Sequence, residues 1–157
     1  ITLLADATYG LYRHDENTFF EKMNVYFAGK GEATELADYT QPLQDLATVY
    51  EGKMSENAYG KCIDWIAKAL TYEMVVPTRV RLLMMMGDCL KNTGETAKAK
   101  QSYNQAFIAS AGIENKAEMK QLQQMIQQLI FIIPDYEKNF TPYYNKYSNS
   151  GPPVRAG

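Results

Sequence analysis

Two segments of the chain that start 37 residues apart carry the same pattern of side chains, and this repeat limits the possible folds more than any other feature. The first copy contains Leu46, Val49, Cys62, Ile66 and Ala69, and the second contains Leu83, Met86, Ala99, Tyr103 and Ala106. Within each copy the spacing is that of apolar positions on one face of a helix, and then of the next helix. The repeating unit is therefore predicted to be a hairpin of two helices.

Helical spacing recurs along the rest of the chain, whereas segments with the alternation and β-branched residues of a strand are nearly absent. We therefore predict an all-α fold, a stack of antiparallel helical hairpins with about seven helices. Pro42 is expected in the first turn of a helix, where its missing N–H does no harm. The expected organisation is one helical-repeat domain over 1–133, divided into a divergent hairpin (1–29), two repeats (34–74 and 78–111) and a capping helix (113–133).

Gly87 stands in the second copy where the first has Tyr50, directly after Met84, Met85 and Met86. A glycine inside a helix costs roughly 1 kcal/mol relative to alanine, so its packing must compensate. We interpret Gly87 as a point of close approach between two helices, with Ala99 facing it. The three methionines point in different directions around a helix, which favours core packing over the alternative of a methionine-rich binding patch.

The second copy resembles the tetratricopeptide repeat. In that family the first helix has a large apolar residue, then a Leu-Gly pair and then another large residue. The second helix has an alanine, an aromatic residue and a second alanine. The matching positions are Leu83, Met86, Gly87, Leu90, Gly94, Ala99, Tyr103 and Ala106. The first copy departs from the pattern at Tyr50, Lys53 and Cys62. A generic stack of helical hairpins is the alternative, with nearly the same architecture.

The resemblance implies a concave surface formed by the first helix of each hairpin. It assigns to this candidate binding face Gln44, Ala47, Glu51, Met54, Arg81, Met84, Asp88 and Lys91. Met84 and Asp88 stand where family members that grip a C-terminal carboxylate have Lys and Asn, so that class of partner is disfavoured. The alternative interpretation is that these residues are an ordinary solvated surface.

Composition and motifs argue against several other functions. A net charge of −2 disfavours nucleic-acid binding, and no apolar run approaches the ~20 residues of a membrane-spanning helix. Cys62 and Cys89 are interpreted as buried packing residues, although a redox or metal pair is the alternative. His14 is the only histidine, which makes a metal site improbable. No catalytic motif is found, and we expect no enzymatic activity, no cofactor and no bound metal.

The function expected from these observations is a non-enzymatic protein–protein interaction module that binds a protein or peptide and forms part of a longer chain. The alternative is the helical C-terminal extension of an enzyme whose catalytic domain precedes residue 1. The chain loosely resembles the helical regions that follow thioredoxin-like domains in some bacterial envelope proteins. That resemblance involves 11–13, 18–20 and 39–42. The compartment stays open between the bacterial envelope and the cytoplasm.

The chain ends in an aromatic tail, 134–157, which has Tyr136, Phe140, Tyr143, Tyr144 and Tyr147 before a polar, Gly/Pro-containing end that we expect to be mobile. Large exposed rings are unfavourable, so 134–147 is expected to pack back on the final helix, with the concave groove near Arg81 and Met84 as the alternative site. The apolar side predicted for that helix consists of Leu122, Met125, Ile126, Leu129, Ile130 and Ile133.

Overall fold

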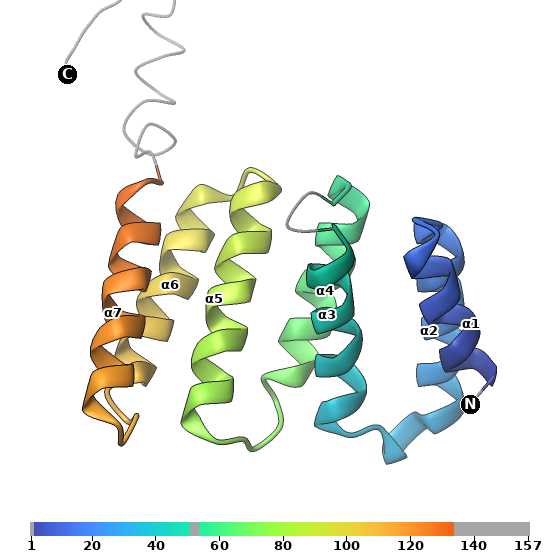
Figure 1. Ribbon diagram of the computed structural model, residues 1–157, viewed down its shortest axis with the longest axis horizontal. Helices are drawn as coiled ribbons and strands as arrows, with labels where there is room; N and C mark the ends of the chain where they lie inside the picture. Colours follow the sequence, from blue (N-terminus) through green and yellow to red (C-terminus); the bar gives the residue numbers. More distant parts are fainter. Residues whose placement is uncertain (1, 51–53, 134–157) are drawn as a thin grey trace, which may run out of the picture. The chain divides into compact units, whose positions relative to one another are not determined.

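The prediction of an all-α fold is confirmed by a computed structural model, which describes residues 2–50 and 54–133. This part of the chain contains seven α-helices, one short 3₁₀ helix and no strand (Figure 1). The chain divides into two compact units, unit 1 over Ile1–Glu73 and unit 2 from Met74 onward. Each unit is described by itself.

Unit 1 contains two helical hairpins joined by the 3₁₀ helix. In order along the chain its elements are α1 (Thr2–Tyr12), α2 (Glu16–Lys30), η1 (Gly31–Ala33), α3 (Leu36–Tyr50) and α4 (Glu56–Ala69). Helix α2 extends one residue past the predicted end of the divergent hairpin at 29, because the chain turns only at Gly31, whose φ is +53°.

The turn between α1 and α2 is closed by His14 in the left-handed conformation, with φ of +59°. The backbone N–H of Asp15 donates to the carbonyl of Gly10, and that of His14 donates to Leu11, which is the Schellman arrangement at a helix end. The Asp15 side chain then caps α2 by accepting from the N–H of Thr18. The tight turn holds the two helices antiparallel.

The prediction that Pro42 lies in the first turn of a helix is wrong. Helix α3 already begins at Leu36 and continues through Pro42. The earlier start is stabilised because the Asp38 carboxylate accepts from the backbone N–H of Glu35 at 2.8 Å, as in one half of a capping box. Burial of Tyr39, Pro42 and Leu43 against the rest of unit 1 offsets the hydrogen bond that the proline removes.

The core of unit 1 is centred on Trp65 of α4, the only tryptophan in the chain. Its ring contacts three phenylalanine rings of α2, with centroid distances of 6.0 Å to Phe19, 5.3 Å to Phe20 and 5.6 Å to Phe27. Tyr39 of α3 stacks on Phe27 at 4.6 Å. Aromatic rings from three helices therefore form one continuous cluster that holds the two hairpins of unit 1 together.

Unit 2 contains α5 (Val76–Asn92), α6 (Thr96–Ser110) and α7 (Lys116–Phe131). Helix α5 begins two residues before the predicted start of the second repeat at 78, because Pro77 is favourable in a first helical turn. Helix α7 begins three residues after the predicted 113, where the Asn115 side chain accepts from the N–H of Glu118 at 2.9 Å. The three helices lie side by side (Figure 1).

The α5–α6 turn has the helix-ending glycine predicted at Gly94, whose φ is +86°. The N–H of Glu95 donates to the carbonyl of Leu90 and that of Gly94 to Lys91, so this turn has the same Schellman pattern as the turn at His14. In α6 the side chains of Ala99, Tyr103 and Ala106 are fully buried, and in α5 those of Leu83 and Leu90 are buried. Met86 is only half-buried.

None of the helices in the described part of the chain combines the length and the hydropathy needed to cross a bilayer. The aromatic tail predicted over 134–157 lies outside the described residues, as does Glu51 of the candidate face.

Candidate functional site

The geometry of α5 depends on the absence of a side chain at Gly87. The Tyr103 ring of α6 lies against the Gly87 backbone so closely that a Cβ there would be 2.4 Å from Tyr103 Cε1 and 2.6 Å from Cδ1. The three atoms nearest to that Cβ all belong to Tyr103, whereas the sequence predicted Ala99 as the facing residue. Glycine therefore makes room for an aromatic ring, which explains why a helix keeps a residue of poor helix propensity.

The Tyr103 ring passes over Gly87, and its hydroxyl donates a hydrogen bond to Oδ1 of Asp88. Burial raises the pKa of Asp88, and the bond from Tyr103 and the charge of Lys91 only partly offset that rise. Burial, followed by the hydrogen bond to Asp88, raises the pKa of Tyr103. Tyr103 is therefore the donor at neutral pH, and the Asp88 carboxylate is held in one position on α5.

Four of the residues assigned to the candidate binding face lie on α5 at i, i+3, i+7 and i+10, which places them within a narrow arc of the helix surface. We call Arg81, Met84, Asp88 and Lys91 the α5 face. Arg81 is exposed and the other three are half-buried. The other side of α5 is buried through Leu82, Cys89 and Leu90, and Val80, Leu83 and Gly87 are buried beside the α5 face. The α5 face therefore belongs to the side of the helix that reaches solvent.

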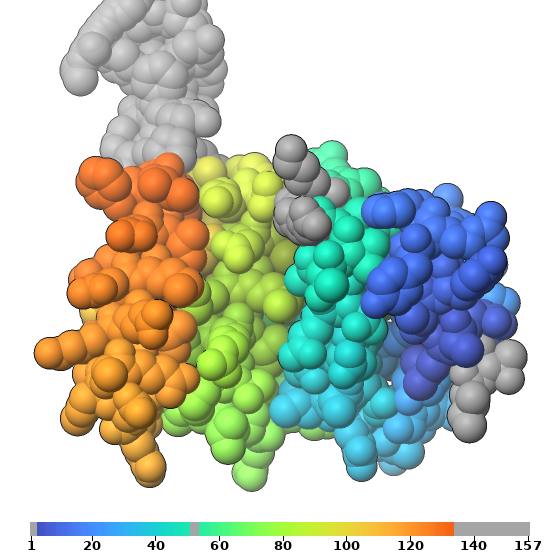
Figure 2. Space-filling view, in the orientation of Figure 1, coloured from blue at the N-terminus to red at the C-terminus, as the bar shows by residue number. Residues whose placement is uncertain are grey.

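Arg81 is oriented by an ion pair with helix α7. Its guanidinium Nη2 lies 3.3 Å from Oε2 of Glu118, and both side chains remain exposed. An exposed pair of this kind adds little to stability, about 0–1 kcal/mol, but it restricts where the guanidinium lies. Figure 2 shows the surfaces of α5 (yellow-green) and α7 (orange) adjoining in unit 2, and the Arg81–Glu118 pair joins them.

The other predicted members of the candidate face belong to unit 1. Gln44 and Ala47 are exposed on α3, one turn apart. Met54 is half-buried but lies beyond Tyr50, where α3 ends, so it does not extend the helical surface that contains Gln44 and Ala47. The structure thus brings Gln44 and Ala47 together in unit 1 and the α5 face together in unit 2. A single surface containing both sets stays a prediction.

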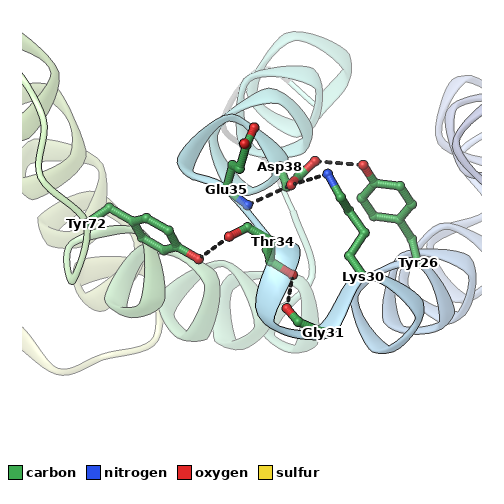
Figure 3. A network of polar contacts seen from close by, with 7 residues as sticks. All are labelled: Tyr26, Lys30, Gly31, Thr34, Glu35, Asp38 and Tyr72. Atoms are coloured by element: carbon green, nitrogen blue, oxygen red, sulfur yellow. Dashed lines mark hydrogen bonds and ion pairs between the residues drawn. The ribbon is translucent and has the colours of Figure 1, made fainter.

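A polar junction that sequence reasoning missed lies between α2 and α3 (Figure 3). The Asp38 carboxylate accepts from the Tyr26 hydroxyl at 2.6 Å, from Lys30 Nζ at 2.9 Å and from the Glu35 N–H at 2.8 Å. Although burial opposes the effect, these donors hold the pKa of Asp38 below its ordinary value. On the other side of the turn the Tyr72 hydroxyl donates to the Thr34 carbonyl at 2.8 Å.

With three donors on one carboxylate, this junction fixes the path of the chain between the two hairpins of unit 1. The only advance signal is the Glu35–Asp38 spacing of a helix N-terminus. Neither Tyr26 nor Lys30 has a spacing in the sequence that links it to Asp38.

Helix α7 has an apolar surface that the predicted stripe did not include. Phe131 is 88% exposed and Ile132 60% exposed, and with Gln124, Gln127 and Gln128 they line an open depression. Ile126 and Ile133 of the predicted stripe are buried, but Met125 is exposed. The segment 134–147, which is expected to pack on the predicted apolar stripe of α7, lies outside the described residues.

Cys62 of α4 and Cys89 of α5 are not joined in a disulfide, and both side chains are buried, as the packing interpretation predicts. Within residues 2–50 and 54–133, no group of three or more His, Cys, Asp or Glu side chains is placed to hold a metal ion.

Comparison of the chain with protein-family models, with curated proteins and with solved structures gave no match in any of the three. The role of the α5 face therefore has to be argued from its own side chains.

Proposed function

We propose that the chain is a non-enzymatic protein-interaction module of the tetratricopeptide-like type, and that the α5 face binds a segment of a partner protein. The observation that carries this proposal is the α5 face itself. It combines a cation at each end, a carboxylate and a methionine within one arc of a helix whose other side is buried.

Two of the four side chains are held in position before any partner arrives. Tyr103 holds Asp88 from the protein interior, and Glu118 holds Arg81 from the neighbouring helix. Groups ordered in advance lose less conformational entropy when they bind, which favours recognition. Met84 adds an apolar and adaptable contact between them. A mixed surface of this kind suits a peptide with both polar and apolar side chains.

The proposal is tested by selecting binders for the full chain from a library of short random peptides and measuring their affinities for variants. Arg81→Glu and Met84→Glu are expected to weaken binding of the selected peptides at least tenfold. Each variant puts an unpaired negative charge where the wild-type side chain contacts the peptide. The matched control is Lys98→Glu on α6, because Lys98 is also exposed and also forms an exposed pair, with Glu95. Its affinities should equal those of the wild type.

The proposal is wrong if no peptide is selected, or if the selected peptides bind Arg81→Glu and Met84→Glu as tightly as the wild type. Equal losses in the Lys98→Glu control would also contradict it, since binding would then depend on net charge alone.

A further inference from the structure

A small cavity in unit 1 is lined by residues of α1, α2 and α3 and has a volume of about 130 Å³. Phe19, Met23 and Pro42, all of them buried, form its apolar wall, and Leu4 adds a partly exposed apolar edge. Pockets for drug-sized ligands run from about 300 Å³, whereas a dry cavity of roughly 150 Å³ holds one benzene. The cavity therefore has room for a single amino-acid side chain.

The polar lining contains two carboxylates whose situations differ. Asp38 already accepts three hydrogen bonds, and Lys30 balances its charge at 2.9 Å. Asp45 accepts one bond, from the Gln41 amide to Oδ1 at 3.1 Å, and no described residue donates to its Oδ2. Asp45 thus has one carboxylate oxygen with acceptor capacity, and no lysine or arginine of the described residues forms an ion pair with it.

Because Pro42 has no N–H, it also leaves the carbonyl of Asp38 without the donor it would have in an uninterrupted helix. The residues that line the cavity therefore have more acceptors than donors. A purely apolar occupant would remove water from Asp45 without replacing its hydrogen bonds, and an anionic occupant would be repelled. A long methylene chain that ends in a cation matches both the apolar wall and the Asp45 carboxylate.

We propose that this cavity takes a lysine or arginine side chain of a partner protein. The methylenes pack against Phe19, Met23 and Pro42, and the cationic end binds Oδ2 of Asp45. The inference rests on the proposed function, since it names a second contact through which the module recognises a basic segment of its partner.

The probe for this site is butylammonium, which reproduces the lysine side chain, titrated into the isotopically labelled full chain by NMR. Saturable shifts are expected at amides of the α1–α3 residues around the cavity, with a dissociation constant in the millimolar range because the probe has few atoms. Butyrate and butanol, which have the same chain length without the positive charge, should give no saturable shift at these residues.

Asp45→Asn is expected to weaken butylammonium binding about tenfold, as the loss of a hydrogen-bonded ion pair predicts. Asp6→Asn is the matched control, since Asp6 is an exposed carboxylate on α1 that does not line the cavity. Fluorescence of Trp65 reports whether unit 1 of each variant is folded.

The inference is overturned if butylammonium gives no saturable shift at the cavity, if butyrate or butanol binds equally well, or if Asp45→Asn binds as the wild type does. Failure here is distinguishable from failure of the proposed function. Peptides that bind in an Arg81-dependent manner without a basic residue would leave the module intact and remove only the cavity.

Discussion

Replacing Gly87 with alanine is predicted to destabilise the protein, although alanine is the better helix former. The substitution gains about 1 kcal/mol of helix propensity. Against this, the new Cβ would lie 2.4–2.8 Å from three atoms of the Tyr103 ring, a separation that requires the ring to move. Tyr103 is fully buried, so its ring cannot withdraw without displacing the side chains packed around it.

Overpacking of this kind costs about 1–3 kcal/mol. Moving the ring also strains or breaks its hydrogen bond to Asp88, and a bond to a charged group is worth about 1.5–3 kcal/mol. Because the two losses overlap and the gain in helix propensity offsets part of them, we expect a net decrease of roughly 1–4 kcal/mol in the free energy of unfolding. The assay is urea unfolding of the full chain followed by circular dichroism. Tyr103→Phe removes only the hydroxyl and measures the hydrogen-bond share separately.

Gly60→Ala is the matched control, because Gly60 also lies inside a helix, α4, but a Cβ there would meet no atom within 4 Å. It should raise the free energy of unfolding by about 0.5–1 kcal/mol. If Gly87→Ala stabilises the protein as Gly60→Ala does, the packing explanation of Gly87 is refuted.

Three further predictions concern the ionisation of Asp38, the ionisation of Asp88 and the core of unit 1. The pKa of Asp38 is lowered in the folded state, so its ionisation stabilises the protein above the unfolded value of 3.8, and this contribution is lost as the pH falls through the folded pKa. Asp38→Asn should therefore reduce stability at pH 7 and make it less sensitive to acid. The pKa of Asp88 is raised, so its stabilising contribution is present only below 3.8 and is lost as the pH rises through the folded pKa. Asp88→Asn, which keeps an acceptor for Tyr103, should be at least as stable as the wild type at pH 7, an advantage that disappears in acid; urea midpoints across the pH range decide both, and the reverse order would contradict them. Trp65→Ala should cost about 3–5 kcal/mol, measured by urea unfolding, because it empties the centre of the ring cluster; a loss below 1 kcal/mol would show that the cluster contributes little.

Sequence reasoning predicted the two helices over 78–111 well because their signals are local. Gly94 ends α5 as predicted, and Tyr103 is buried at the predicted position on α6. Helical spacing and turn chemistry depend on neighbours within a few residues, so they can be read from a single chain. The residues of the α5 face were assigned by the resemblance to the repeat family, but the anchoring of Asp88 by Tyr103 requires knowing where the ring points.

The features that were missed depend on contacts between residues of different elements, or on residues that are uncommon in the conformation they adopt. His14 closes a turn of the same type as Gly94, but a histidine in the left-handed conformation gives no signal of a helix end. Pro42 was misplaced because the burial of its ring, a tertiary effect, outweighs its tendency to begin a helix. The Asp38 junction combines side chains of α2 and α3, and the cavity beside Asp45 combines side chains of α1, α2 and α3. The sequence pattern of one helix does not show which residues of another helix it will contact.

The two connections closed by left-handed glycines differ as sites for protein engineering. Between Gly31 and Glu35 the chain is held by Asp38 on one side and Tyr72 on the other, so an inserted tag or cleavage sequence would separate bonds that join α2, α3 and the segment after α4. Gly94 is exposed, and no atom lies within 4 Å of the position a Cβ would occupy there. A label for single-molecule or affinity work belongs in the α5–α6 turn, where added residues extend into solvent.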